Sequence, residues 1–380
     1  MHVASRSVTG QGSGSRGSGR PNAANPRRHP WTAGPALVLV VVVGLVFAAC
    51  GSGPTNLSGG SGSTPGQSET LTLYNAQHEQ TTDALIAAFT KATGIKVRVD
   101  NDNEDDFTAR IELEGDRSPA DLFYTENSNW LQQLDNRGLL TKVDAATLAN
   151  VPEADSATNG GWVGVSSRIS VLVYNPSKVS ASQLPTSVLG LADHRWMGKI
   201  EIAPSETDFW PIVSSIARVD GQAAALAWLK GLKANAGNGA TVPDNETIVS
   251  DVSQGTTDLA VINHYYFYRL KSELGTGSVH AEIAYFAPHD VGYLEDISGA
   301  AILKSSKHKA AAQKFLAFLT SDAGQKVVAA GDSFEYPIHP GVAANSELVP
   351  LDHLQPSSFT PAELGTGLDA KKLMQESGLL

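Results

Sequence analysis

The chain has 380 residues, of which 41% are hydrophobic and 7% aromatic, enough for two domains with apolar cores. Its net charge is −11. Five arginines and no other charged residue precede Cys50, so removing those five positive charges leaves −16 for the remainder. So acidic a chain repels nucleic acid, which we exclude as a partner. The single cysteine excludes an intrachain disulfide.

The N-terminal segment has the pattern of an export signal. A basic start precedes an apolar run at 36–49, which is shorter than the ~20 residues of a membrane span. The ending Ala-Ala-Cys at 48–50 resembles that of bacterial lipoproteins, although Phe47 stands where leucine is usual. This resemblance implies a signal peptide at 1–49, a lipidated Cys50 and a chain anchored to the outer face of the cytoplasmic membrane. An uncleaved N-terminal anchor is the alternative, and it also places the rest of the chain outside.

Strand and helix patterns alternate after a flexible tether rich in Gly and Ser at 50–69. Alternating or continuous apolar residues predict strands at 71–74, 95–99, 120–124, 170–174, 199–203, 259–263 and 299–303. Helical spacing predicts helices at 82–93, 129–136, 222–232, 266–274 and 309–320. The opening strand-helix-strand pattern predicts a parallel sheet, and the alternation over some 300 residues favours an α/β fold with two lobes.

Polar side chains directly follow three of the predicted strands. His78 comes after the first strand, Glu126 after the strand at 120–124, and the pair Tyr265 and Tyr266 after the strand at 259–263. Ligands bind at the carboxyl ends of strands in open parallel sheets, so these residues are expected to share a cleft. Taken singly, each also has a structural explanation: a loop histidine, a helix-start carboxylate and an aromatic core segment.

Together, the four side chains form a set of one nitrogen donor and three hard oxygen donors. Zinc prefers Cys and His, and calcium prefers carboxylates, carbonyls and water. A phenol ionises near pH 10, so each phenolate costs about 4 kcal/mol at pH 7, which a trivalent cation offsets more readily than a divalent one. Glu126 with two phenolates supplies three negative charges, which would balance ferric iron beside a neutral His78.

At these residues the chain resembles the bacterial ferric-iron-binding proteins, the extracytoplasmic components of iron ABC importers. The resemblance runs from about residue 70 to the C-terminus. It is carried by LYNAQH at 73–78, EGDRSPADLFYTE at 114–126, WMGKI at 196–200, INHYYFY at 262–268 and EYP at 335–337. It implies that His78, Glu126, Tyr265 and Tyr266 ligate Fe³⁺ as the transported ligand.

The resemblance also implies a synergistic anion such as phosphate or carbonate, contacted by Asn245 and Asn263, with Arg168 near a further contact position. The small neutral anion loop of the family aligns here with Glu206, Thr207 and Asp208. Two acids at this place should repel an anion. We therefore hypothesise that phosphate is not the co-ligand, and that water, another anion or a local carboxylate completes the coordination.

The fold implied by the resemblance is the two-lobed, type II periplasmic-binding-protein-like fold, with hinge strands and an interlobe cleft. Crossovers near Arg168 and Ser298 would divide the chain into an N-lobe of 70–168 plus about 298–346 and a C-lobe of about 169–297 plus 347–380. The protein would act as a monomer that closes on iron and delivers it to an ABC permease in the cytoplasmic membrane.

Two other interpretations remain open at this point. The same fold could bind a polyamine, thiamine or another small solute, since Glu126 and the tyrosines also suit a cationic organic ligand. A metalloenzyme is the second alternative, but the sequence has no second well-placed histidine and none of the common catalytic motifs. We therefore expect no enzyme activity and assign no catalytic residue.

Overall fold

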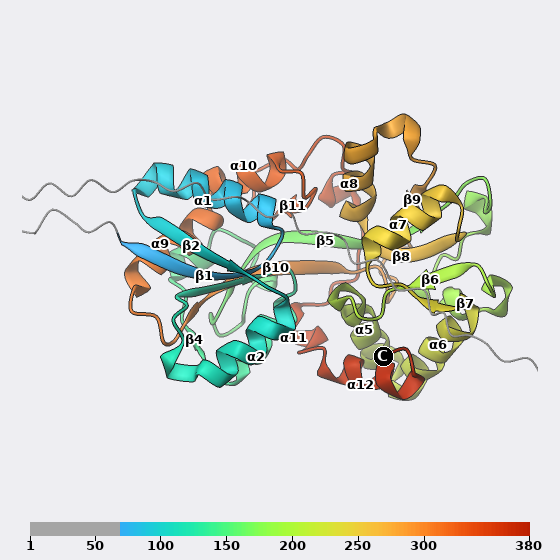
Figure 1. Cartoon of the computed structure of the whole chain (residues 1–380), viewed down its shortest axis with the longest axis horizontal. Helices are drawn as coiled ribbons and strands as arrows, with labels where there is room; N and C mark the ends of the chain where they lie inside the picture. The colour runs from blue at the N-terminus through green and yellow to red at the C-terminus, as the bar shows by residue number, and fades with distance from the viewer. Residues whose placement is uncertain (1–68) are drawn as a thin grey trace, which may run out of the picture. The chain divides into compact units, whose positions relative to one another are not determined.

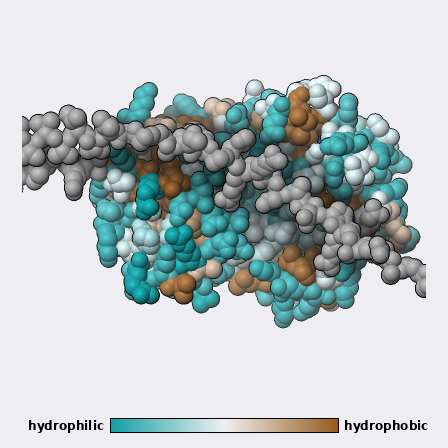
Figure 2. Space-filling view, in the orientation of Figure 1, coloured by the Kyte–Doolittle hydropathy of each residue, from teal (hydrophilic) through white to brown (hydrophobic). Residues whose placement is uncertain are grey.

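The computed structural model describes residues 69–380 (Figure 1). The predicted signal peptide, Cys50 and all of the tether but its last residue lie outside the described residues. Within 69–380, none of the helices combines the length and the apolar character needed to cross a membrane. On the part of the face that Figure 2 leaves uncovered, hydrophilic residues predominate and apolar ones form small separate patches.

The first sheet contains the strands nearest the N-terminus and two strands that come later in the chain. Its order is β2 (Lys96–Asn101), β1 (Thr70–Ala76), β3 (Leu122–Thr125), β10 (Glu295–Leu303) and β5 (Val163–Tyr174). β1 is parallel to β2 and β3, as predicted. β10, however, is antiparallel to both β3 and β5, because it re-enters this sheet from the opposite end. The sheet is therefore mixed and not purely parallel.

The second sheet begins where the first one ends along β5. Ile169 of β5 pairs with β10, and the next residue, Ser170, pairs with β8 (Leu259–Asn263). β8 is parallel to β6 (Ile200–Ile202), which is parallel to β7 (Ala236–Thr241). We call the elements around the first sheet the first lobe and those around the second sheet the second lobe. β5 thus runs through both lobes as one continuous strand.

Short strands complete the two sheets. β4 (Leu140–Thr141) pairs with β10, and β11 (Tyr336–Pro337) pairs with the first-lobe part of β5. β9 (Glu282–Ala284) pairs with the second-lobe part of β5.

Helices cover both sheets (Figure 1). In the first lobe they are α1 (Glu79–Thr93), α2 (Glu104–Glu114), α3 (Ser128–Asn136), α4 (Ala145–Leu148), α9 (Lys309–Leu319) and α10 (Asp322–Ala330). In the second lobe they are α5 (Trp210–Asp220), α6 (Gln222–Asn235), α7 (Asn245–Gln254), α8 (His264–Leu274) and α12 (Leu368–Ser377). The short α11 (Pro361–Leu364) contacts α3 of the first lobe and α5 of the second.

Two apolar clusters hold these layers together. One lies wholly in the first lobe, where Phe89 of α1 meets Phe315 of α9 with ring centroids 5.0 Å apart. The other extends along β5 into the second lobe and includes Val171, Leu172 and Ile262. Every residue of β5 is buried, since the strand has sheet neighbours on both sides and helices on its faces. Burial of this kind contributes about 1.5–3 kcal/mol for each large apolar side chain.

Every predicted strand and helix is present, with ends that differ by a few residues. The largest differences are at β5, which begins seven residues earlier than the predicted start at Ser170, and at β10, which begins four residues earlier than the predicted start at Gly299. The patterns did not predict the helices α2, α4, α5, α7, α10, α11 and α12 or the strands β4, β7, β9 and β11. α2 opens with three acids, Glu104, Asp105 and Asp106, and has a weak apolar stripe, so its sequence resembles a solvated loop.

Candidate metal centre

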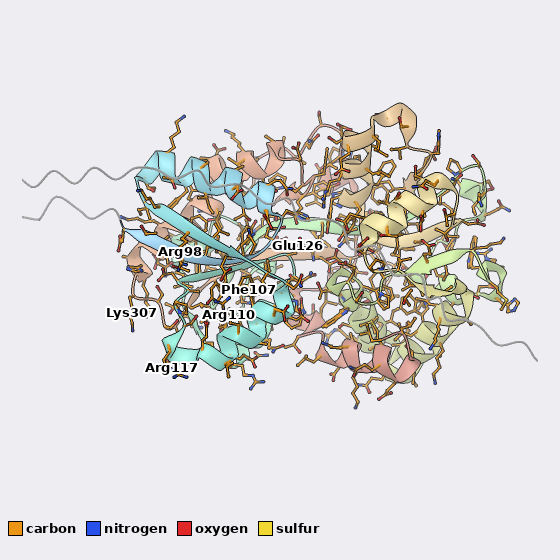
Figure 3. All side chains as sticks on the ribbon, viewed as in Figure 1. Arg98, Phe107, Arg110, Arg117, Glu126 and Lys307 are labelled. Carbon is orange, nitrogen blue, oxygen red and sulfur yellow. The ribbon has the colours of Figure 1, made fainter. Side chains whose placement is uncertain are left out.

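The polar residues singled out in the sequence lie at the carboxyl ends of strands from both lobes. His78 follows β1 and is the N-cap residue of α1. Glu126 follows β3 and precedes the N-cap residue of α3, Asn127. Figure 3 shows Glu126 at the end of the first lobe nearest the second lobe, whereas Lys307 and Arg117 lie toward the opposite end.

The two tyrosines converge because they occupy the first turn of α8, directly after β8. Their ring centroids are 4.1 Å apart, and both hydroxyl groups donate to Oδ2 of Asp208, at 3.1 Å from Tyr265 and 3.0 Å from Tyr266. The Tyr265 hydroxyl also lies 3.2 Å from Oε2 of Glu126. Tyr265 of the second lobe therefore contacts a carboxylate of the first lobe directly, whereas Tyr266 reaches Asp208.

His78 is held beside Glu126 as a neutral ring. Its Nδ1 lies 3.1 Å from Oε1 of Glu126. Burial, together with the positive charges of Arg269 and Arg168, lowers the pKa of His78 to about 3. A neutral ring that donates from Nδ1 keeps its lone pair on Nε2, and Nε2 is buried without a hydrogen-bond partner among the described residues. The Nε2 lone pair of His78 is thus available to bind a metal ion.

The acidic groups of the site are strongly perturbed. Burial and the charge of Asp208 raise the pKa of Glu126, and burial, Asp208 and Glu126 raise the pKa values of both phenols above their usual range. Burial also opposes ionisation of Asp208, but Arg168 and Asn127 outweigh it and hold the pKa of Asp208 below its usual value. A highly charged cation can displace protons from such oxygens, since the cation becomes the largest local charge.

Arg168 is fully buried on β5, and its guanidinium is engaged by the protein. One terminal nitrogen bonds Oδ1 of Asp208 at 3.1 Å and also Oδ1 of Asn127, and the other bonds the carbonyl of Glu126. Arg168 was expected to lie near a co-bound anion. In the structure it is paired with the carboxylate of Asp208.

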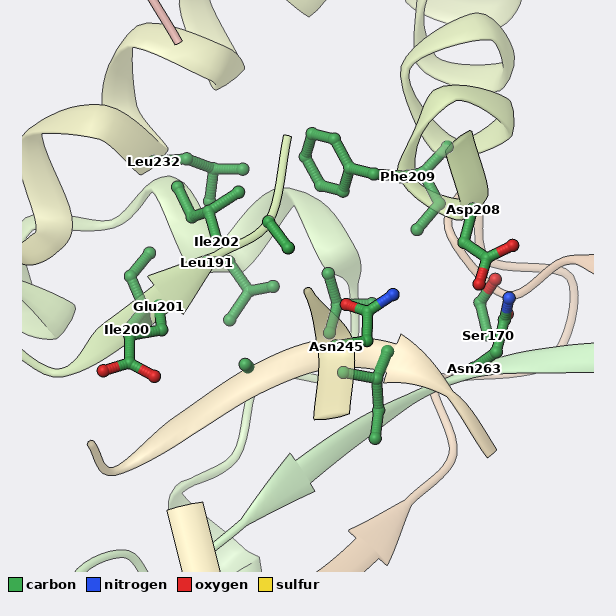
Figure 4. A pocket seen from close by; sticks show the side chains of 15 residues that line it. Ser170, Leu191, Ile200, Glu201, Ile202, Asp208, Phe209, Leu232, Asn245 and Asn263 are labelled. Atoms are coloured by element: carbon green, nitrogen blue, oxygen red, sulfur yellow. The ribbon is translucent and has the colours of Figure 1, made fainter. Parts of the chain in front are cut away.

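The remaining residues expected around an anion also lie beside Asp208. In Figure 4, Asp208, Ser170 and Asn263 point toward one another, with Asn245 on the same pocket wall. This cavity has a volume of about 20 Å³, which holds one water molecule, and most of its other walls are apolar. The Asp208 carboxylate contacts the two phenols and Arg168, and it also lines this small cavity.

A larger cavity of about 650 Å³ opens beside the site. Its walls include Glu104, Glu126, Glu206 and Thr207, and no Lys, Arg or His side chain is among its lining residues. Burial and Asp208 raise the pKa of Glu206 to about 8, so this side chain is mostly protonated at neutral pH. The wall also includes Glu79, Asp102 and Asp105, and these further acids without basic neighbours favour the approach of cations.

Within residues 69–380, no group of three or more His, Cys, Asp or Glu side chains is placed to hold a metal ion. A metal bound here would therefore need the phenol oxygens as well as His78 and the carboxylates. One residue of this site, Glu104, was not anticipated from the sequence. It lies in a run of acids at 102–106, which is typical of a solvated surface.

The chain has two α/β lobes, a strand that passes from one lobe to the other, and a buried polar site where the lobes meet. This is the architecture of a solute-binding protein. The family description "Bacterial extracellular solute-binding protein" matches residues 75–326. The chain belongs to this family and, within it, to the bacterial ferric-iron-binding proteins, as the following relatives show.

The "Fe(3+)-binding periplasmic protein" of Serratia marcescens is 39% identical over 310 residues, covering 82% of this chain and 90% of that protein. The "Major ferric iron-binding protein" of Neisseria meningitidis serogroup B is 36% identical over 311 residues, covering 81% and 93%. Among solved structures, iron-bound HitA from Pseudomonas aeruginosa matches with a TM-score of 0.78 and 40% identity, over 82% of this chain and 99% of HitA. A Trichodesmium protein in complex with iron and citrate matches with a TM-score of 0.73 and 30% identity, over 81% and 99%.

Proposed function

We propose that this chain captures ferric iron between its two lobes and delivers it to an ABC-type importer. The observation that supports this proposal most directly is the set of contacts at the site. Both phenols contact Asp208, Tyr265 also contacts Glu126, and the imidazole of His78 contacts Glu126. His78, Glu126, Tyr265 and Tyr266 would hold the metal. Deprotonated phenols and Glu126 supply three negative charges, which match Fe³⁺ with His78 neutral. The names of the relatives support the same cargo.

Asp208 takes the part that an exogenous anion would otherwise have. Its carboxylate contacts both phenols, is held ionised by Arg168 and lines the small cavity together with Asn245 and Asn263. A built-in carboxylate at this place already uses the hydrogen bonds of Arg168 and of both phenols, and its negative charge disfavours phosphate beside it. Of the three groups considered from the sequence to complete the coordination, water, another anion or a local carboxylate, we therefore propose the local carboxylate.

The remaining parts of the proposal follow from the sequence pattern and from strand pairing. Export and lipidation at Cys50 would anchor a monomer to the outer face of the membrane, where a permease receives the closed form. The passage of β5 from one sheet to the other at Ile169 and Ser170 supports a division into an N-lobe of 70–168 plus about 298–346 and a C-lobe of about 169–297 plus 347–380. No enzyme activity belongs to this proposal.

The direct test is a visible absorption titration of the soluble part, from Gln67 onward, with ferric citrate. Phenolate bound to ferric iron gives a charge-transfer band in the visible, and we expect this band to saturate at one iron per chain. Parallel titrations with a polyamine and with thiamine test the alternative ligands by calorimetry. Absence of the band together with tight polyamine or thiamine binding would replace iron as the cargo.

Substituting Asp208 by serine should convert iron binding into an anion-dependent reaction. Without added phosphate or carbonate, the affinity of Asp208→Ser for iron should fall about 10- to 100-fold, as is typical when a group supporting a metal centre is lost. Added anion should restore much of it, because Arg168 is then free to pair with the anion. Asp220→Ser, which removes an exposed acid at the end of α5, is the charge-matched control. Equal loss with and without anion would argue against this role of Asp208.

A further inference from the structure

Glu104, the first residue of α2, has a carboxylate that is almost fully engaged by hydrogen bonds. Only 8% of the residue is exposed. Oε1 accepts from the Thr125 hydroxyl and from the Asn127 backbone N–H at 2.7 Å. Oε2 accepts from Asn127 Nδ2 and Trp130 Nε1, both at 3.0 Å, and from the Thr207 hydroxyl. Five donors meet one carboxylate.

The donors have a particular relation to the metal centre. Thr125 and Asn127 are the residues directly before and after Glu126, so Glu104 fixes the backbone that presents that carboxylate. Thr207 directly precedes Asp208 and belongs to the second lobe. Glu104 thus connects the segment around Glu126 to the loop that carries Asp208.

Asn127 strengthens the same connection. Its Nδ2 lies 2.9 Å from the Thr207 hydroxyl and 3.2 Å from Oδ1 of Asp208, in addition to its contact with Glu104. Asn127 therefore links the lobes alongside Glu104: the Thr207 hydroxyl donates to Glu104, and Asn127 donates to Thr207, Asp208 and Glu104. Hydrogen bonds to charged groups are about twice as strong as those between neutral groups.

An extra metal ligand is the competing role for Glu104. A carboxylate has about four lone-pair sites, and five donors already use them. Binding a metal would require the loss of contacts to Thr125, Asn127 or Thr207. The geometry thus favours a positioning role over ligation.

We propose that Glu104 is a positioning residue that clasps the Thr207–Asp208 loop of the second lobe against the first lobe, and so slows the release of iron. This inference rests on the proposed function. Opening of the lobes must break the bond between Glu104 and Thr207, whereas the contacts of Glu104 with Thr125, Asn127 and Trp130 stay within the first lobe. Glu104 would accordingly act on the opening step and leave the character of the iron–phenolate bonds unchanged.

A double-mutant cycle across the cleft tests the clasp. Iron release into excess EDTA is followed by loss of the charge-transfer band in Glu104→Gln, Thr207→Val and the double variant. Each single substitution should speed release about tenfold, since each removes a hydrogen bond to a charged group. The double variant should be slower than the product of the two single effects, because both substitutions remove the bond between Glu104 and Thr207, although Thr207→Val also removes the contact with Asn127. Independent effects, which would multiply to about a hundredfold, or unchanged rates would overturn the proposal.

Further variants separate the clasp from a general loss of structure. Thr207→Ser keeps the hydroxyl group and should restore wild-type release, and this comparison stands even if Glu104→Gln fails to fold. Ser205 lies on the same loop as Thr207, and its hydroxyl donates to the Pro243 carbonyl. Ser205→Ala should leave the rate of iron release unchanged. If Thr207→Ser releases iron as fast as Thr207→Val, the proposed role of Glu104 is wrong, even though the charge-transfer band persists. If the wild-type chain gives no band, the proposed function fails and this inference fails with it.

Discussion

Replacing Tyr265 or Tyr266 by phenylalanine is expected to lower the affinity for ferric iron by more than the roughly 10- to 100-fold typical of losing a partner of a metal ligand. Each substitution removes one phenolate donor and one of the three negative charges that balance the metal. The charge-transfer band should weaken and shift in each single variant and disappear in the double variant. The measurement is the titration with ferric citrate, followed in the visible.

Tyr268→Phe is the matched control for these variants. Tyr268 lies on the same helix, α8, but its ring stacks on Phe334 with centroids 5.8 Å apart, and it makes no contact with Asp208. Its loss should leave the band and the affinity unchanged. If the Tyr268 variant lost the band while the Tyr265 and Tyr266 variants kept it, the assignment of the phenol pair would be wrong.

The affinity for iron should rise steeply with pH. Burial, Asp208 and Glu126 raise the pKa of both phenols, so both carry protons at neutral pH in the absence of metal, and iron must displace them. Release of two protons makes the association constant rise about hundredfold per pH unit. Below the raised pKa of Glu126 a third proton adds to this slope. His78, with a pKa of about 3, stays neutral between about pH 5 and 7 and adds none.

Competition with a chelator of known proton dependence measures this slope. Tyr266→Phe provides an internal check, because its slope should be lower than that of the wild-type chain by one proton. A slope of one or less in the wild-type chain would show that the phenols are not both ionised in the complex.

Periodicity was sufficient to predict the longer strands except β7, the helices α1, α3, α6, α8 and α9, and which strand ends carry polar groups. The pattern could not reveal the antiparallel insertion of β10, since strand direction depends on the route of the chain through the second lobe. Nor could it reveal α2, whose acidic start looks like a surface loop until Thr125, Asn127 and Thr207 are seen to surround Glu104.

For the site, residue types at strand ends indicated His78, Glu126 and the tyrosine pair, and the family resemblance added Asp208 as one of two unexpected acids. What the sequence did not give is the pairing of Asp208. Whether that carboxylate repels an anion or replaces one depends on the 3.1 Å contact with Arg168 and on both phenol contacts. Such contacts join residues far apart in the chain, so no local pattern encodes them.

The position of β10 has a consequence for the order in which the protein matures. β10 lies between β3 and β5 in the first sheet, yet it is synthesised after almost the whole of the second lobe. The first lobe cannot complete its hydrogen-bond ladder until β10 and then β11 have been added, whereas β6, β7 and β8 with α5 to α8 can associate earlier. The contacts that close the first sheet span long stretches of chain, which makes their formation slow. A chain of this kind remains incompletely folded for longer after synthesis, and this property suits passage across a membrane before folding.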